Sequence, residues 1–196
     1  MDLSDRVVEA AATSFRQFGY KGTTMDQVAR IANVGKGTIY TFFPSKEALF
    51  EHILNSLIDE MRRLAEEAIQ PGDPFFVNLE RAMRKVLQFR QQHELFVKLA
   101  HEVRYLGTAA VGEGLDRVER AIVSYLRRHI EDGIKHGDVK ECNAELVAFI
   151  LLKTYTAMVN EWALHHTPLT DDELMRIFHL VFAQGLDQSK QGGGSE

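Results

Sequence analysis

The chain has 196 residues, of which 45% are hydrophobic and 26% are charged, and its formal net charge at pH 7 is -5. This composition predicts a folded protein with a hydrophobic core, and the negative charge excludes nucleic-acid binding through overall charge alone. The apolar runs are far shorter than the ~20 residues that span a bilayer, and the N-terminus lacks the pattern of a signal peptide. The lone cysteine agrees with a reducing compartment, so we expect the protein in the cytoplasm.

Helical periodicity runs through nearly the whole chain, and no stretch shows the alternation typical of strands, so we expect an all-α fold. In the first helix, Ser4 is the predicted N-cap. An apolar stripe follows at helical spacing, at Val7, Ala11, Phe15 and Phe18. Gly19 is predicted to end the helix in a left-handed conformation.

Two short helices are predicted next, in the run TTMDQVARIANVGKGTIYT. Thr24, with Gln27 three residues later, forms the pattern of a capping box for a helix over residues 25–32. Asn33 tolerates a left-handed conformation and is predicted to turn the chain into a second helix over residues 36–41.

Longer helices are expected in the rest of the chain. Pro44 stops the second short helix, and Ser45 can cap the long helix that follows. The clearest break is the QPGDP segment that comes after this long helix. The expected helices cover residues 46–69, 75–91, 94–106, 111–135, 144–164 and 171–184.

The GKGT segment at residues 35–38 allows two interpretations. A nucleotide-binding P-loop needs a glycine five residues before its Gly-Lys pair and a Ser or Thr directly after the lysine. Arg30 and Gly37 occupy those two positions here, and the surrounding pattern is helical. The spacing therefore favours a helix-turn-helix, in which the second of two short helices lies in the major groove of DNA.

Residues 23–50, TTMDQVARIANVGKGTIYTFFPSKEALF, resemble the DNA-binding signature of TetR/AcrR-family regulators. The turn, the recognition helix, the aromatic cluster and the Ser-Lys-Glu cap all occur in the family's order. The resemblance implies an N-terminal three-helix DNA-binding domain over residues 1–47. It also implies a C-terminal helical domain for ligand binding and dimerisation over residues 48–188, followed by a flexible glycine-rich tail over residues 189–196.

The predicted DNA contacts lie in the turn, the recognition helix and two adjoining helix starts: Thr24, Gly35, Lys36, Gly37, Thr38, Tyr40, Thr41 and Lys46. Gly37 allows close approach to DNA, while Lys36 can reach a phosphate or a guanine edge. The hydroxyl of Tyr40 suits a phosphate contact, and Lys46 combines a cation with the free N–H groups of a helix start. Thr24 would equally serve as a cap alone, and Lys46 as a solvated lysine.

Three positions depart from the family's pattern. Gly35 stands where a Ser or Thr usually caps the recognition helix, Thr41 where an aromatic residue is common, and Phe42 where a histidine is common. We expect three apolar residues of this region in the core that holds the helices together, namely Ile39, Phe42 and Phe43.

The local charge agrees with DNA binding. Residues 1–50 carry six Lys or Arg and five Asp or Glu, so this part is slightly basic while the rest of the chain is acidic. Because salt screens charges more than ~10 Å apart, an acidic protein can bind DNA through a locally basic face.

The last helical stretch predicts a dimer surface. Its apolar residues recur at i, i+3, i+4, i+7 and i+8, at Leu174, Ile177, Phe178, Val181 and Phe182. The stretch before it, ELVAFILLKTYTAMVNEWAL, is apolar on nearly all sides and needs burial on two faces. The family resemblance implies a homodimer that is built on these two helices and binds a palindromic operator of double-stranded DNA, most often as a repressor.

The resemblance further implies that a small, largely hydrophobic effector releases the DNA. The candidate effector contacts are Phe96, Leu99, Arg104, Tyr105, Phe149, Lys153, Asn160 and Trp162. For the apolar ones, ordinary core packing is the alternative. The stretches LAHEVRYLG and GIKHGDVKE resemble the family's regulators of fatty-acid metabolism, which respond to long-chain acyl-CoA.

Other function classes find less support in the sequence. The eight histidines show none of the usual metal-ligand spacings, and no nucleophile–base pair or cofactor loop is visible. We therefore predict no metal, no cofactor and no enzymatic activity. The remaining alternative is a helical small-molecule-binding protein that does not read DNA sequence, which salt-dependent binding to a duplex would distinguish from a regulator.

Overall fold

The structure, a computed structural model, describes residues 2–88, Glu102 and residues 108–187. Its regular structure within these residues is helical, apart from an isolated antiparallel bridge between Val139 and Asp187. The prediction of an all-α fold is confirmed. None of the described helices is both long enough and apolar enough to cross a lipid bilayer.

The described residues divide into two compact units. Two long helices, α4 (Lys46–Ala68) and α7 (Ala109–His136), contribute residues to both units. The predicted domain boundary after residue 47 stays a prediction. The first unit contains residues 2–60, 102 and 108–118, and the second contains residues 61–88 and 119–187.

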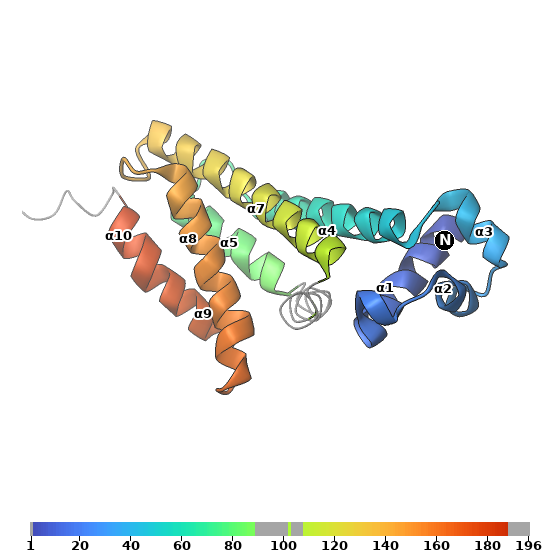
Figure 1. Cartoon of the computed structure of the whole chain (residues 1–196). Coiled ribbons are helices and arrows are strands. Elements are labelled where there is room, and N and C mark those ends of the chain that lie inside the picture. The colour runs from blue at the N-terminus through green and yellow to red at the C-terminus, as the bar shows by residue number, and fades with distance from the viewer. Residues whose placement is uncertain (1, 89–101, 103–107, 188–196) are drawn as a thin grey trace, which may run out of the picture. The chain divides into compact units, whose positions relative to one another are not determined.

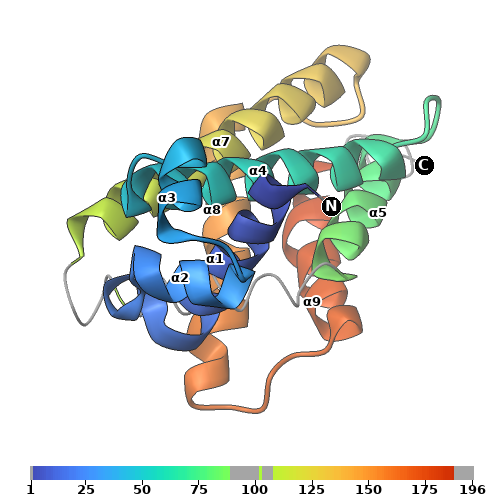
Figure 2. The ribbon, with the colours of Figure 1, turned by 90° about the vertical axis from the view of Figure 1, so that its right-hand side faces the viewer.

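Three N-terminal helices form what we call the head of the first unit: α1 (Leu3–Gly22), α2 (Met25–Ala32) and α3 (Lys36–Phe42). Figures 1 and 2 show these three helices grouped together from two directions. The helix predicted over residues 25–32 is confirmed. The predicted cap at Ser4 is wrong, because Asp2 and Asp5 form a reciprocal capping box that begins α1 earlier.

The last part of α1 bends at Gly19, whose φ is 74°. The left-handed conformation predicted there is confirmed, although one more helical turn follows it to Gly22. Phe18 is 50% exposed, whereas Phe15 of the same predicted stripe is buried. Helical periodicity puts both on one stripe, but burial near the end of a helix also needs a neighbouring element to cover the side chain.

An aromatic cluster joins the head to the first part of α4. The rings of Phe15, Tyr20 and Phe50 have centroids 5.0 to 5.7 Å apart, and all three side chains are buried. Each buried aromatic ring removes a large apolar area from water, so this cluster holds α1 against α4. An ion pair between Arg117 and Glu51 then connects α7 to α4 within the same unit.

The second unit is built from the remaining parts of α4 and α7 together with shorter helices. These are α5 (Phe75–Gln88), α8 (Ala144–Thr156), the π-helical turn η1 (Ala157–Glu161), the 3-10 turn η2 (Trp162–Leu164), α9 (Asp171–Phe178), the π-helical turn η3 (His179–Ala183) and α10 (Gln184–Leu186). The helical structure predicted over residues 144–164 and 171–184 is thus confirmed. The helix predicted over residues 94–106 lies outside the described residues except for Glu102, which is helical.

The core of the second unit collects apolar side chains from four helices and η3. Leu87 of α5, Ile130 of α7 and Leu151 of α8 meet Leu174 and Phe178 of α9 there. Both α8 and α9 turn one face toward this core and keep exposed residues on another. The outward residues are therefore available to a partner.

Candidate nucleic-acid interface

Local contacts at the start and at the end of α2 define this helix and the turn that follows it. Thr24 caps the start of α2, because its Oγ1 accepts the N–H of Gln27 at 3.2 Å. At the other end Asn33 adopts the left-handed conformation, with φ 53°. Arg6 of α1 donates to the carbonyl of Ala32 at 2.6 Å and to that of Asn33 at 3.3 Å. These contacts hold the turn that directs α3.

The inner face of α3 is held by buried apolar residues. Ile39 is fully buried, and Phe43, just after the helix, is 7% exposed. The cap residue Gly35 makes no side-chain cap, and the first turn is closed by the N–H of Thr38 donating to the Gly35 carbonyl at 3.0 Å. Phe42 is 42% exposed, so its predicted burial is wrong. A two-turn helix turns a single face to the core, and Ile39 occupies that face.

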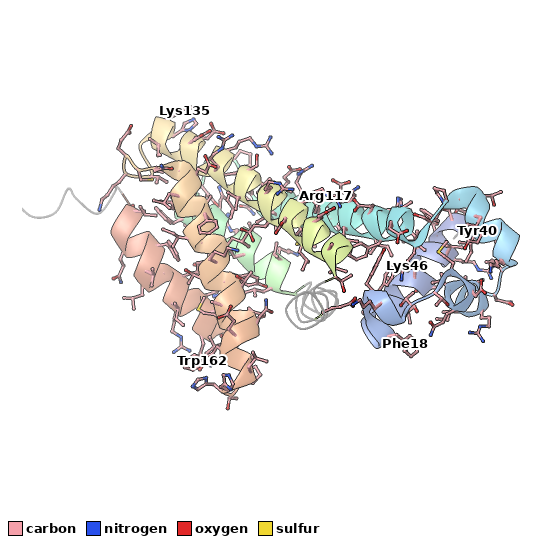
Figure 3. The ribbon with its side chains drawn as sticks, in the orientation of Figure 1. Phe18, Tyr40, Lys46, Arg117, Lys135 and Trp162 are labelled. Atoms are coloured by element: carbon pink, nitrogen blue, oxygen red, sulfur yellow. The ribbon has the colours of Figure 1, made fainter. Side chains whose placement is uncertain are left out.

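The outer face of α3 is open to solvent. A Cβ added to Gly37 would meet no atom within 4 Å, so the fold itself does not require glycine at this position. Thr38 is half-buried, and the hydroxyl of Thr41 donates to its carbonyl. Figure 3 labels Tyr40 on this helix. The exposed residues of the face are Gly35, Lys36, Gly37, Tyr40, Thr41 and Phe42.

The electrostatics of this face depend on one ion pair. Lys36 Nζ lies 2.7 Å from Asp26 Oδ1, and the two side chains are 61% and 59% exposed. The hydrogen bond to Asp26 raises the pKa of Lys36 above its usual value, so Lys36 is charged at neutral pH. Because both partners face water, the pair contributes little to the stability of the fold. Arg30 of α2 adds a second exposed cation.

Lys46, at the start of α4, points its charge toward the end of α1. Its Nζ donates to the carbonyls of Tyr20 at 2.9 Å and Thr23 at 3.0 Å, and it lies 4.2 Å from the centroid of the Tyr20 ring. Figure 3 labels it at this junction. Two of its three N–H donors are therefore used within the first unit. Its phosphate contact stays a prediction beside this structural role.

Two residues of this region are not revealed by sequence patterns. Arg6 binds carbonyls that lie 26 and 27 residues further along the chain, and no local sequence signal links them. Asp26 reads as an ordinary acid in the first turn of a helix, which is favourable there by itself. Its pairing with Lys36 depends on the angle between α2 and α3, which the fold sets.

The predicted dimer residues divide into two groups. Leu174, Phe178 and Phe182 are buried in the core of the second unit, and Ile177 is half-buried. Val181 is 53% exposed. One edge of the apolar stripe therefore packs in the core of the second unit, and the other edge is exposed to solvent.

Exposed apolar side chains lie on both of the last long helical stretches. Exposed apolar groups of this kind often mark a surface that another molecule covers. On α8 they recur at helical spacing. The set comprises Leu146, Phe149 and Ile150 on α8, and Leu180 and Val181 on η3.

Half of the candidate effector contacts fall on described residues. Lys153 Nζ lies 2.6 Å from Glu119 Oε2 and 5.3 Å from the centroid of the Phe149 ring, and both Lys153 and Phe149 are exposed. Trp162, labelled in Figure 3, is also exposed, and Asn160 is half-buried in η1. These four residues thus do not line a closed interior in the described part of the chain. The other four lie outside the described residues: Phe96, Leu99, Arg104 and Tyr105.

Metal chemistry finds no support in the described part. Across residues 2–88, 102 and 108–187, no group of three His, Cys, Asp or Glu side chains is placed to hold a metal ion.

Known proteins share this arrangement of helices. Residues 7–53 match the family model of bacterial regulatory proteins of the tetR family. The chain is 47% identical over 186 residues to the uncharacterized HTH-type transcriptional regulator YhgD of Bacillus subtilis (strain 168), which covers 95% of this chain and 97% of YhgD.

One further relative and one solved structure extend the comparison. The HTH-type negative transcriptional regulator IcaR of the biofilm operon icaADBC, from Staphylococcus aureus (strain Newman), is 31% identical over 62 residues, or 32% of this chain and 33% of IcaR. The solved structure of the fatty acid degradation regulator FadR from Bacillus halodurans matches with a TM-score of 0.74 at 18% identity, over 91% of this chain and 93% of that one. At this identity the match shows a shared fold.

Proposed function

The chain belongs to the TetR family of bacterial regulatory proteins and is a helix-turn-helix transcriptional regulator, and from this premise we propose that it is a homodimeric, cytoplasmic repressor of a palindromic operator. A small, largely hydrophobic effector releases it from DNA. The observation that carries the proposal is the outer face of α3, which is open to solvent while Ile39 holds the inner face. Repression is supported by the similarity to IcaR, which is named a negative regulator.

The outer face of α3 offers contacts of three kinds to a major groove. Lys36 supplies a cation for a phosphate or a guanine, and Tyr40 supplies a hydroxyl for a phosphate. Gly37 lets the backbone approach closely. Phe42 adds an apolar ring, which suits a thymine methyl group or a sugar rather than the phosphate contact that a histidine would make.

Dimer formation is supported by the exposed apolar residues of α8 and η3. Leu180 is 63% exposed and Val181 53% exposed in the single chain. A second copy that covered these side chains would remove their apolar surface from water and so stabilise the pair. Two heads held in one dimer can then read two half-sites one DNA turn, ~34 Å, apart or a multiple of it.

For the effector, we propose a long-chain acyl-CoA or a molecule of similar apolar character. The resemblance of LAHEVRYLG and GIKHGDVKE to regulators of fatty-acid metabolism supports this class. Tyr125 of α7 supplies a polar group: its hydroxyl is buried and has no hydrogen-bond partner within the described residues. Burial raises the pKa of Tyr125, which is therefore neutral and able to donate. Buried polar groups are normally hydrogen-bonded, so this hydroxyl is a candidate partner for a polar atom of the effector.

Selection of bound duplexes from a random DNA pool tests the proposal. We expect the purified protein to enrich a palindromic site, and we expect Lys36→Ala to lose that enrichment. Tyr40→Phe should weaken binding to the same site without lowering the melting temperature, because its hydroxyl is exposed. If no site were enriched, the helical small-molecule-binding protein would be the better interpretation.

The salt dependence of binding gives a second criterion. Two subunits with about three phosphate contacts each predict a log K against log[salt] slope of roughly -5, at about -0.9 per phosphate. Lys36→Ala should make the slope shallower by about 2 for the dimer, at about 1 per lysine. A slope near zero would contradict specific DNA binding by this face.

The effector class is tested on the selected operator. Acyl-CoA of C12 to C18 should release the operator at saturating concentration, while free CoA should not. An unaltered binding curve would remove this class and leave the regulator itself intact.

A further inference from the structure

A buried carboxylate holds the end of α1. Glu102 is 6% exposed and lies more than eighty residues further along the chain than the two backbone N–H groups of α1 that it binds. Its Oε2 accepts the N–H of Tyr20 at 2.6 Å, and its Oε1 accepts the N–H of Lys21 at 2.9 Å and the hydroxyl of Thr108 at 3.2 Å. Burying a charge is costly unless hydrogen bonds compensate it, and here both oxygens are used.

The backbone of α1 is shaped to receive this carboxylate. Gly19 has a φ of 74°, which directs the next two N–H groups toward one point. A Cβ on Gly19 would lie 2.6 Å from Glu102 Oε2, so a side chain there would displace the carboxylate, and the positive φ itself favours glycine. Backbone concavities of this kind bind anions, and in this protein the anion is a side chain of the same chain.

Both backbone polar groups of Tyr20, which follows the kink at Gly19, are hydrogen-bonded to side chains from other parts of the first unit. Glu102 binds the N–H of Tyr20, and Lys46 of α4 binds its carbonyl. The Tyr20 hydroxyl also donates to Glu47 at 2.7 Å. Since Thr108 directly precedes α7, these contacts tie the last turn of α1 to the starts of both α4 and α7 within the first unit.

We propose that Glu102 is a positioning residue for DNA binding, which fixes the head against the starts of α4 and α7. The inference rests on the proposed dimeric operator binding. Glu102 belongs to the predicted effector domain of residues 48–188, whereas its two backbone partners belong to the predicted DNA-binding domain of residues 1–47. Any ligand that shifts Glu102 therefore changes how the heads are held.

A positioning role should affect the affinity for a palindrome and the affinity for a half-site differently. A half-site needs only one intact head, while a full palindrome needs two heads at a fixed separation. Loss of positioning should therefore weaken binding to the palindrome much more than binding to the half-site. A residue that served only to fold the head would weaken both.

The test compares wild type, Glu102→Gln, Glu102→Ala and Thr108→Val on the palindrome enriched by selection and on its isolated half-site. Glu102→Gln keeps one acceptor oxygen but turns an amide N–H₂ toward a backbone N–H. Thr108→Val removes a single hydrogen bond. These two milder variants still test the proposal if the alanine variant does not fold. Glu113→Gln is the matched control, because Glu113 is an exposed acid of α7. All variants are checked by thermal melting.

For Glu102→Gln we expect the palindrome affinity to fall about tenfold or more, since bivalent binding is lost, and the half-site affinity to change less than about twofold. Thr108→Val should show a smaller loss of the same kind, and Glu113→Gln none. Equal losses on both duplexes, or an unchanged palindrome affinity in Glu102→Gln, would overturn the positioning role alone. A wild type that bound palindrome and half-site equally would overturn dimeric operator binding, and this inference with it.

Discussion

Lys36 Nζ lies 2.7 Å from Asp26 Oδ1, so the cation at the start of α3 is paired with an acid of the preceding helix. Both groups are exposed, and a phosphate that approaches Lys36 also meets the charge of Asp26. The acid should therefore oppose the DNA contact that we propose for the lysine, and this opposition can be measured.

Asp26→Asn is expected to raise the affinity for DNA roughly three- to tenfold, since an exposed charge interaction of about 1 kcal/mol corresponds to about fivefold in affinity. The melting temperature should fall by no more than a few degrees, because the ion pair is exposed and the favourable charge at the start of α2 contributes at most about 1 kcal/mol. Fluorescence anisotropy on the selected operator measures the affinity, with Glu9→Gln, an exposed acid of α1, as the control. A weaker complex would instead indicate that Asp26 orients Lys36 for binding.

Gly37→Ala is expected to stabilise the fold and weaken DNA binding. An added Cβ meets no atom within 4 Å, and alanine favours a helix by about 1 kcal/mol over glycine, so the melting temperature should rise. The same methyl group would keep the backbone of α3 from DNA, and we expect about a tenfold loss of affinity. Gly185→Ala is the matched control, because its Cβ is equally free of contacts and lies outside the helix-turn-helix. Undiminished affinity in Gly37→Ala would argue against close approach at this position.

Val181→Asp is expected to break the dimer without unfolding the chain, because Val181 is 53% exposed. Phe178→Asp is a poorer probe, since Phe178 belongs to the core and its loss would unfold the second unit. Analytical ultracentrifugation measures the mass, and Leu3→Asp, which changes an exposed apolar residue of α1, should leave it unchanged. If Val181→Asp had the same mass as wild type, η3 would not belong to the interface.

The hydrogen bond between Tyr20 and Glu47 predicts a dependence on acid. The Tyr20 hydroxyl lowers the pKa of Glu47 below its usual value, while burial raises the pKa of Tyr20 and keeps it neutral. A carboxylate with a lowered pKa in the folded state contributes stability above its unfolded pKa, and this contribution is lost as the pH falls through the folded value.

Tyr20→Phe should therefore lower the urea midpoint at about pH 7, and this effect should shrink as the pH falls through the lowered pKa of Glu47 and its carboxylate is protonated. Tyr40→Phe, which removes an exposed hydroxyl, should show no such dependence on pH. An effect of Tyr20→Phe that stayed equal as the pH fell would mean that the hydroxyl does not stabilise the carboxylate.

The sequence by itself determined several local features of the head, although not the cap that begins α1. Thr24, Asn33 and Gly19 act through their own backbone and near neighbours, so their cap and left-handed conformations followed from residue type and spacing. The order of motifs in residues 23–50 also identified the family. These signals are short-range, and they do not depend on how the helices pack.

Tertiary structure decided which way several side chains face. Phe42 is expected in the core and Phe18 shares a stripe with the buried Phe15, but both side chains are exposed in the described part of the chain. The apolar stripe of α9 and η3 is buried along one edge and exposed along the other, because the core of the second unit covers Phe178 and not Val181. Glu102 meets α1 only because the folded chain brings distant residues together. A repeat of 3.6 residues defines a stripe, while the packing of other elements decides which part of it is buried.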